Sequence, residues 1–403
     1  MNFWQILYIL DWILFIPVAF TVAYIFIFSI SALFLNKRIP NKAKQEHIFI
    51  VLIPAYKSDK IIIDTINSIL GQAYPQRNFD VVVVSDHQSE MTNMRLAQLP
   101  ITLLTPNFEN SSKAKSLQYA ILNLPQFKIY DAVIVLDAGN VVDPDFLKEV
   151  NEAYDTSGSK VIQCHRIARN NDTPIARLEA IFEEINNTIF RKGHLAVGLS
   201  SALNSSGTIF DFQWFKQNIM KVRTTVGEDK ELEAMLAHEG IFVDYFEHIH
   251  IYDIKSHHSK EFNSQHGRWI YAQLYALVSN IRHLPNALMN SHYDYIDKII
   301  QWGLIPRMIL TRIIIIMSLV LPFIYLTSAI KWWIIAAIIL FAYSLATPNY
   351  LVDKNWDKDF LHTPQIILGG FFSFHTGRNK TENPKESFFH RLKNLVSFKK
   401  KQK

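Results

Sequence analysis

The sequence contains a single cysteine, Cys164, among its 403 residues. One thiol excludes an internal disulfide and any multi-cysteine zinc or iron–sulfur site, so a reducing compartment is permitted and we expect Cys164 to be structural. Charged residues are also scarce, at 19%, whereas apolar residues make up 49%. This composition excludes an intrinsically disordered chain. The length predicts two or three folding units.

The net charge of +5 is concentrated at one end. Residues 378–403 carry nine Lys and Arg against two Glu, a local charge of +7, so the rest of the chain sums to −2. We therefore expect no nucleic acid as a partner. A basic cytoplasmic tail over 375–403 would attract anionic membrane lipids, and a solvated end is the alternative.

An uncharged run near the N-terminus predicts a membrane helix within residues 1–36. Residues 12–35 contain no charge, which gives about 36 Å of helix against a hydrocarbon core of about 30 Å. Four cations follow it: Lys37, Arg38, Lys42 and Lys44. By the positive-inside rule, these cations place the following segment in the cytoplasm.

A second apolar block predicts two more spans within 309–350, joined by a short turn at Lys331, Trp332 and Trp333. Residues 286–308 are expected to form interfacial helices. The segment 360–374 is too short to span and contains a His and a Pro, so it is expected to lie at the interface. The localisation expected is multi-pass in the inner or plasma membrane, with the catalytic domain in the cytoplasm.

Residues 45–285 have the pattern of an α/β domain. Residues 48–53, 81–84 and 133–136 are continuous apolar runs, typical of strands buried on both faces of a parallel sheet. A helical pattern follows the first run over 59–71, and this alternation favours a doubly wound topology. Ligands of such sheets bind at the carboxyl ends of the strands.

Polar residues stand directly after each of these strands. The first strand is followed by Pro54-Ala55-Tyr56, the second by Ser85-Asp86 and the third by Asp137-Ala138-Gly139-Asn140. Asp86 can accept a hydrogen bond from a nucleobase or ribose, and Asp137 can hold a ribose hydroxyl or a metal. Lys113 opens a helix where its charge and the free N–H groups suit a diphosphate. The alternative is simple strand-end capping with a solvated lysine.

Two later motifs carry further chemistry. Glu228-Asp229 introduces a helix over 230–238, either as dipole partners or as a general base with its neighbour. Gln265, Arg268 and Trp269 share one helical face at i, i+3 and i+4. An amide, a guanidinium and an indole together suit a sugar ring and a diphosphate.

These motifs resemble the membrane-bound family-2 glycosyltransferases, which include cellulose, chitin and hyaluronan synthases and ceramide glucosyltransferase. The resemblance covers residues 48–283, and its most specific element is Gln265-x-x-Arg268-Trp269 after Glu228-Asp229. It implies a GT-A fold, with a Rossmann-like, mostly parallel sheet and flanking transmembrane helices. It also implies inverting transfer of a sugar from a nucleotide donor, with a UDP-sugar expected.

The resemblance also implies roles for individual residues. Asp229 would be the catalytic base, and the loop 204–208 would line the acceptor pocket. Asp137 would lie at the diphosphate and metal, and Lys113 at the ribose or phosphate side of the donor. The uridine would be held by Pro54, Ala55, Tyr56 and Asp86, and the diphosphate and acceptor end by Gln265, Arg268 and Trp269.

The metal motif departs from this family. Its Asp-x-Asp reads Asp137-Ala138-Gly139 here, with Asn140 or Asp143 as possible substitutes for the second carboxylate. We therefore expect a weakly held Mg²⁺ or Mn²⁺ that arrives with the donor. Five histidines, His248, His250, His257, His258 and His266, lack the spacing of a zinc site.

The acceptor is the least specified partner. Three spans are fewer than polysaccharide synthases usually build into a secretion channel, so lipid-linked and polysaccharide acceptors both stay open. A homo-oligomer or polysaccharide-export partners are also possible. A different class of function is a non-catalytic membrane partner that binds a nucleotide or sugar, as the missing metal carboxylate would suggest.

Overall fold

The computed structural model describes residues 3–36, 38–125, 127–224, 226–255 and 259–351. The expected interfacial segment at 360–374 and the basic tail at 375–403 therefore lie outside the described residues, as do His257 and His258.

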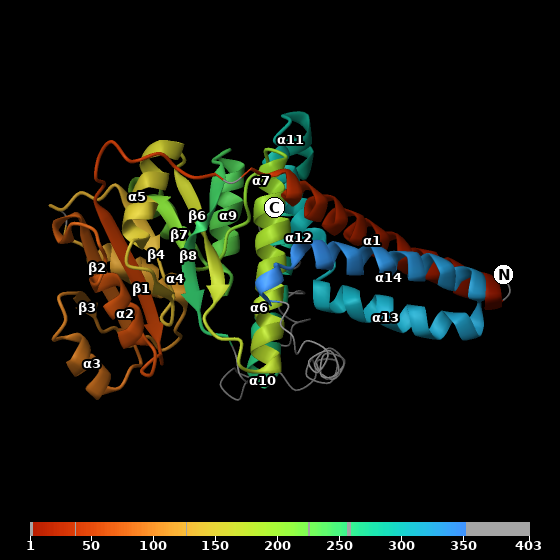
Figure 1. Cartoon of the computed structure of the whole chain (residues 1–403), viewed down its shortest axis with the longest axis horizontal. Coiled ribbons are helices and arrows are strands. Elements are labelled where there is room, and N and C mark those ends of the chain that lie inside the picture. Colours follow the sequence, from red (N-terminus) through yellow and green to blue (C-terminus); the bar gives the residue numbers. More distant parts are fainter. Residues whose placement is uncertain (1–2, 37, 126, 225, 256–258, 352–403) are drawn as a thin grey trace, which may run out of the picture.

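A mixed sheet of eight strands forms the left half of Figure 1. Its order is β3-β2-β1-β4-β7-β6-β8-β5, and six strands run parallel whereas β5 and β7 run against them. The three predicted strands are confirmed as β1, β2 and β4. The strands are β1 Phe49–Tyr56, β2 Phe79–Asp86, β3 Thr102–Leu104, β4 Ala132–Val135, β5 Val141–Val142, β6 Val161–Ala168, β7 Thr208–Asp211 and β8 Val243–Asp253.

Helices cover both faces of this sheet, so its central strands are buried except at their ends. One apolar core joins alternate strand residues to α2, α3 and α5, and a second joins the other residues to α4, α8 and α9. Cys164 on β6 is 1% exposed and packs in the first core, as expected for a structural thiol. The helices are α2 Ile62–Leu70, α3 Glu90–Leu96, α4 Lys113–Leu122, α5 Phe146–Ser157, α8 Phe212–Ile219 and α9 Glu228–His238.

A second group of helices lies between the sheet and the apolar helices (Figure 1). In it, α6 runs directly into the π-helix η3, and α12 packs against both α9 and α10. These helices are α6 Pro174–Asn186, η3 Asn187–Gly193, α7 His194–Ala196, α10 Ser259–Asn280, α11 Leu284–Met289 and α12 Tyr293–Gly303, and the short 3-10 turns are η1 Ala32–Phe34, η2 Gln76–Asn78, η4 Ile281–His283 and η5 Asn349–Leu351.

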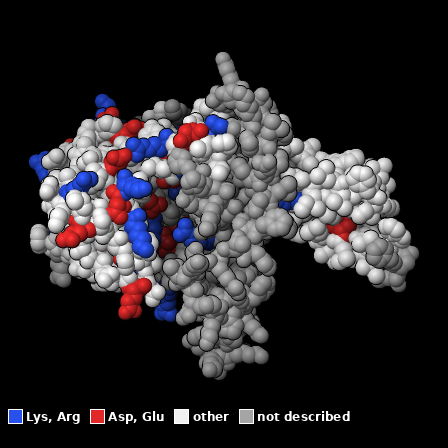
Figure 2. All heavy atoms as spheres, turned by 90° about the horizontal axis from the view of Figure 1, so that it is seen from below, with Lys and Arg blue, Asp and Glu red and all other residues white. Residues whose placement is uncertain are grey.

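Three apolar helices project from the rest of the molecule as an arm: α1 Phe3–Ser31, α13 Arg307–Ile324 and α14 Leu326–Ala346 (Figure 1). Residues Trp4–Phe34 and α14 are each long and apolar enough to cross a membrane. Helix α13 meets that test only together with α12, from which it is bent by 52°. The described chain thus has two candidate spans, or three if the bent pair is one. Figure 2 shows an arm with almost no charge on the face seen.

The predicted turn at residues 331–333 is wrong, because α13 and α14 are separated at Tyr325. Lys331 and Trp332 lie inside α14 and contact the carboxylate of Asp11 on α1. The indole Nε1 of Trp332 donates to Asp11 Oδ1 at 2.8 Å, and Lys331 Nζ lies 2.5 Å from Oδ2. A paired charge is tolerated inside an apolar bundle, so the lysine does not need a water-exposed turn.

Candidate active site

A cavity of about 1960 Å³ lies where the carboxyl ends of β1, β2 and β4 meet α9, α10 and the base of the arm. The residues predicted to form the site lie around this cavity. It is lined by the ten residues expected to act as base or to bind the donor and the acceptor end: Pro54, Ala55, Tyr56, Asp86, Lys113, Asp137, Asp229, Gln265, Arg268 and Trp269.

Asp86 presents a buried acceptor at the end of β2. The residue is 1% exposed, and its Oδ1 pairs with His87 Nδ1 at 2.6 Å. Its Oδ2 is buried and has no hydrogen-bond partner within the described ranges. Tyr56, at the end of the neighbouring β1, is 51% exposed. A flat ring beside an unsatisfied carboxylate oxygen is suited to a nucleobase or ribose that donates a hydrogen bond.

Lys113 links three parts of the cavity wall. It is the first residue of α4, whose N-cap is Ser112. Its Nζ donates to Asp137 and to the backbone carbonyl of Ser205, and it lies 3.9 Å from Glu228. Burial lowers the pKa of Lys113, but the charges of Asp137 and Glu228 outweigh burial, so the pKa is raised. Lys113 is therefore a permanent cation at this end of the cavity.

The two residues considered as substitutes for the missing metal carboxylate are engaged elsewhere. Asn140 Oδ1 accepts from the backbone N–H of Asp137 at 2.9 Å, and its Nδ2 donates to Asp253 at 3.0 Å. Asp143 accepts from Tyr252 Oη at 3.0 Å. The geometry does not support the hypothesis that either residue completes the metal site, because neither of them lines the cavity beside Asp137.

Gly139 cannot readily be replaced by the aspartate of the usual motif. Its φ is +117°, and a Cβ would lie 2.9 Å from Ile61 Cδ1. The described residues contain no group of three or more His, Cys, Asp or Glu placed to hold a metal ion. The residues present thus fit a divalent cation only where donor phosphates supply most of its ligands.

The helix α9 begins at the cavity with two acidic residues. Its N-cap, Gly227, has φ +85°, a conformation that favours glycine. A Cβ at this position would also lie 2.5 Å from Ala272 Cβ on α10, so both the backbone conformation and the packing require glycine. Burial raises the pKa of Glu228 to about 7, against the opposing charge of Lys113. Burial also raises the pKa of Asp229, which the charge of Lys230 partly offsets. Two carboxyl groups with raised pKa values in a cavity are candidates for proton transfer.

The face of α10 closes the cavity opposite α9. Gln265, Arg268 and Trp269 all line it, and Trp269 is 40% exposed. The imidazole of His266 lies 4.8 Å from the Trp269 ring and 6.1 Å from that of Phe182. An aromatic surface beside a guanidinium is thereby available to a sugar and a diphosphate.

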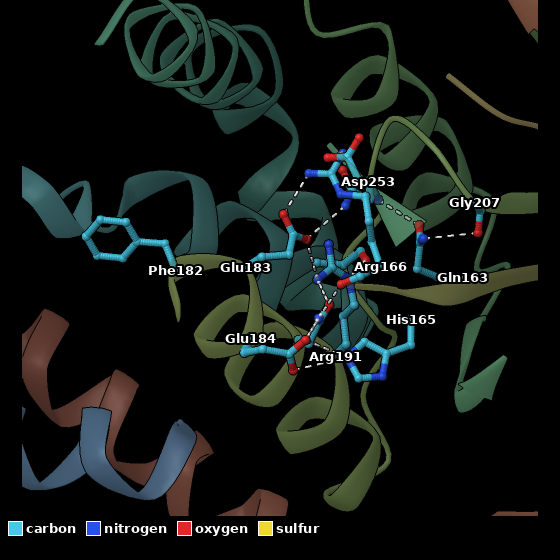
Figure 3. Close-up of polar contacts among 12 residues, drawn as sticks. Gln163, His165, Arg166, Phe182, Glu183, Glu184, Arg191, Gly207 and Asp253 are labelled. Carbon is cyan, nitrogen blue, oxygen red and sulfur yellow. Dashed lines mark hydrogen bonds and ion pairs between the residues drawn. The ribbon is translucent and has the colours of Figure 1, made fainter. Parts of the chain in front are cut away.

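A buried ionic cluster in the cavity wall was missed from the sequence (Figure 3). Glu183 on α6 lies 2.7 Å from Arg166 on β6, 3.7 Å from Arg191 on η3 and 3.6 Å from Lys255. Burial raises the pKa of Glu183, but these cations outweigh burial and lower it. Arg166, Glu183 and Arg191 all line the cavity. The signal in the sequence is a charge inside an apolar strand, as with Arg166 in 161–168.

Comparisons with known proteins show the family to which this chain belongs. The family model described as "Glycosyltransferase like family 2" matches residues 46–272, and a comparison with curated protein sequences found no significant match. The mannosyltransferase PcManGT from Pyrobaculum calidifontis, solved with GDP-Man and Mn²⁺, is similar over 92% of this chain and 100% of its own, with TM-score 0.55 and 14% identity.

A crystal structure of S. aureus TarS 1–349 has TM-score 0.42 and 14% identity, over 83% of this chain and 94% of its own. The mannosyltransferase similarity is one of fold, whereas the family model covers more than half of the sequence. The GT-A fold and the predicted resemblance are thus confirmed, and the enzyme class is preferred to a non-catalytic partner. The chain belongs to glycosyltransferase family 2.

Proposed function

We propose that this enzyme is an inverting glycosyltransferase that moves a sugar from a nucleotide-sugar, preferably a UDP-sugar, to a lipid-linked or polysaccharide acceptor at the membrane. The observation that carries the proposal is the cavity of about 1960 Å³. It joins the strand ends, Asp229 and the Gln265-x-x-Arg268-Trp269 face to Thr21 and Ile25 of the apolar helix α1.

In this proposal Asp229 removes the proton from an acceptor hydroxyl as that oxygen attacks the anomeric carbon. Attack from the face opposite the leaving nucleoside diphosphate inverts the configuration. Lys113 and Arg268 balance the charge that develops on the diphosphate. Mg²⁺ or Mn²⁺, when bound with the donor beside Asp137, would add Lewis-acid stabilisation of the same charge.

Membrane orientation follows from the cations after the first span. The proposal places residues 37–305 in the cytoplasm, where nucleotide-sugars are made. A cysteine introduced at Ser157 should react with an impermeant maleimide only after cells are permeabilised. Cys164 is 1% exposed, so its background reaction should be small. Reaction of the new cysteine in intact cells would contradict this topology.

The direct test is a donor screen with the purified full-length protein in detergent and lipid extract. Labelled UDP- and GDP-sugars are supplied in turn, with and without Mg²⁺ or Mn²⁺, and transferred label and released nucleotide are measured. We expect one donor to give both products in equal amounts, and Asp229→Asn to give neither above background. Nucleotide binding without transfer from any donor would contradict the proposal.

A further inference from the structure

Arg307 stands where the apolar arm joins the cavity. It is the first residue of α13 and lines the cavity. Its Nη2 donates to the backbone carbonyl of Phe182 at 3.1 Å, and its guanidinium lies 5.4 Å from the centre of the Phe182 ring. Its Nη1 is buried, and nothing in the described part of the chain accepts a hydrogen bond from it. A buried cationic donor without an acceptor is costly unless a ligand supplies one.

The neighbouring cluster cannot satisfy Arg307. Glu183, the one carboxylate that lines the cavity here, already accepts from Arg166 and lies 3.7 Å from Arg191. Figure 3 shows the Phe182 side chain pointing away from that cluster, and Arg307 stacks on this side chain. In this part of the wall, the cations Arg166, Arg191 and Lys255 share the carboxylates of Glu183 and Asp253. With Arg307, four cations lie near two carboxylates, and no ion pair joins Arg307 to either carboxylate within the described residues. Guanidinium groups bind phosphate strongly, so the excess favours an anionic ligand.

The same end of the cavity has apolar walls. Ile25 of α1, Phe190 of η3, and Leu304, Ile305 and Met308 before and within α13 line it beside Arg307. An anion bound here would therefore carry an apolar part directed toward α1 and α13. The cavity also exceeds the 300–1,000 Å³ of a typical small-ligand pocket, which leaves room for an acceptor beside the donor.

We propose that the acceptor is a glycan carried on a lipid phosphate or diphosphate, and that Arg307 binds this anionic headgroup. This inference rests on the proposed function. The phosphate serves to hold the acceptor, and a hydroxyl of the carried sugar reaches Asp229 and loses its proton there. The new bond joins that oxygen to the anomeric carbon, and the bond to the diphosphate breaks, with its electron pair leaving on the nucleoside diphosphate.

The test measures binding by the purified full-length protein in a neutral detergent, with farnesyl phosphate, farnesol and inorganic phosphate as probes. A charge-assisted hydrogen bond predicts that farnesyl phosphate binds about tenfold or more tightly than farnesol. Inorganic phosphate, which lacks the apolar part, should bind more weakly still. Equal affinity for farnesol and farnesyl phosphate would overturn the anionic headgroup, and tight binding of inorganic phosphate would overturn the lipid.

Variants of Arg307 test whether this residue causes the preference for farnesyl phosphate. Arg307→Gln should reduce the preference for farnesyl phosphate to within about twofold, and Arg307→Lys should retain part of it, since a point charge remains. The matched control is Arg312→Gln, which is on the same helix, is buried and does not line the cavity. Thermal unfolding of every variant identifies any that fail to fold. If Arg307→Gln does not fold, the affinities of Arg307→Lys are compared with wild type in its place. An unchanged preference in a folded Arg307 variant would overturn the proposal.

Nucleotide binding separates this inference from the proposed function. UDP and GDP affinities are measured on the same samples, and we expect them to be unchanged by Arg307→Gln. Loss of nucleotide affinity in that variant would assign Arg307 to the donor and overturn the acceptor role. A wild-type protein that binds nucleotide but shows no preference for farnesyl phosphate would refute only the headgroup site. A wild-type protein that binds neither nucleotide would refute the proposed function itself.

Discussion

The two ends of the cavity differ in how their residues are specified. At the strand ends, Asp86 and Asp137 follow apolar strands directly, so short motifs place them. At the end beside the apolar arm, Arg166, Glu183 and Arg191 come from β6, α6 and η3 and meet only through tertiary packing. The strand end of the cavity is therefore encoded locally, whereas the end beside the arm depends on how the arm and α6 pack on the sheet.

The largest expected effect concerns the proposed base. Asp229→Asn keeps the side-chain shape but removes its basicity, so transfer should fall by at least about 10²–10⁴-fold while nucleotide binding is retained. Initial rates and nucleotide affinity are measured on the same preparation. Asp145→Asn, an exposed position outside the cavity, is the control and should keep the wild-type rate. Asp229→Asn turnover within a few-fold of wild type would remove Asp229 from this role.

The next largest effect is expected on stability, at the end of the cavity beside the apolar arm. Glu183→Gln leaves Arg166, Arg191 and Lys255 without their shared carboxylate, and breaking a buried ion pair in this way costs about 3–5 kcal/mol. Chemical denaturation in detergent should show this loss. The exposed Glu90→Gln serves as control and should change stability by less than about 0.5 kcal/mol. Equal stability of both variants would mean that the cluster is solvated.

A smaller effect is expected at the nucleoside end. Asp86→Asn replaces a buried carboxylate oxygen that lacks a partner, so nucleotide affinity should weaken by about 1–3 kcal/mol. Titration with UDP and with GDP measures it. Asp80→Asn, on the same strand but absent from the cavity lining, should bind nucleotide as wild type does. If both variants bind equally well, the donor lies away from the β2 end.

The smallest expected effect is a shift of the pH profile. Burial raises the pKa of Asp229 and the charge of Lys230 opposes that rise, so Lys230→Gln should raise the pKa further. A base works only when ionised, so the acidic limb of kcat/KM should move to higher pH. The exposed Lys216→Gln is the control and should leave the limb in place. A shift to lower pH in Lys230→Gln would contradict the assignment of the titrating group.

Much of the strand end of the cavity could be predicted from the sequence, because its signals are local. The predicted apolar strands correspond to β1, β2 and β4, and residues 54–56, Asp86 and Asp137 at their carboxyl ends line one cavity. The turn predicted at Lys331 was wrong because Lys331 and Trp332 both contact Asp11, which lies in another helix. Trp332 and Asp11 are 321 residues apart in the sequence. Arg307 went unnoticed for the same reason, since only packing against Phe182 shows that its Nη1 lacks an acceptor. Long-range pairing of this kind leaves no periodic pattern in the sequence.

In the proposed function, a sugar passes within one cavity from a donor at the strand ends to an acceptor held at the membrane. The most direct measurement is the partition of labelled product between chloroform–methanol and water. The product is made by incubating washed membranes that contain the protein with its labelled donor. We expect label in the organic phase, with none for Asp229→Asn and less for Arg307→Gln. Label found only in an aqueous polymer, with Arg307→Gln as active as wild type, would contradict this expectation.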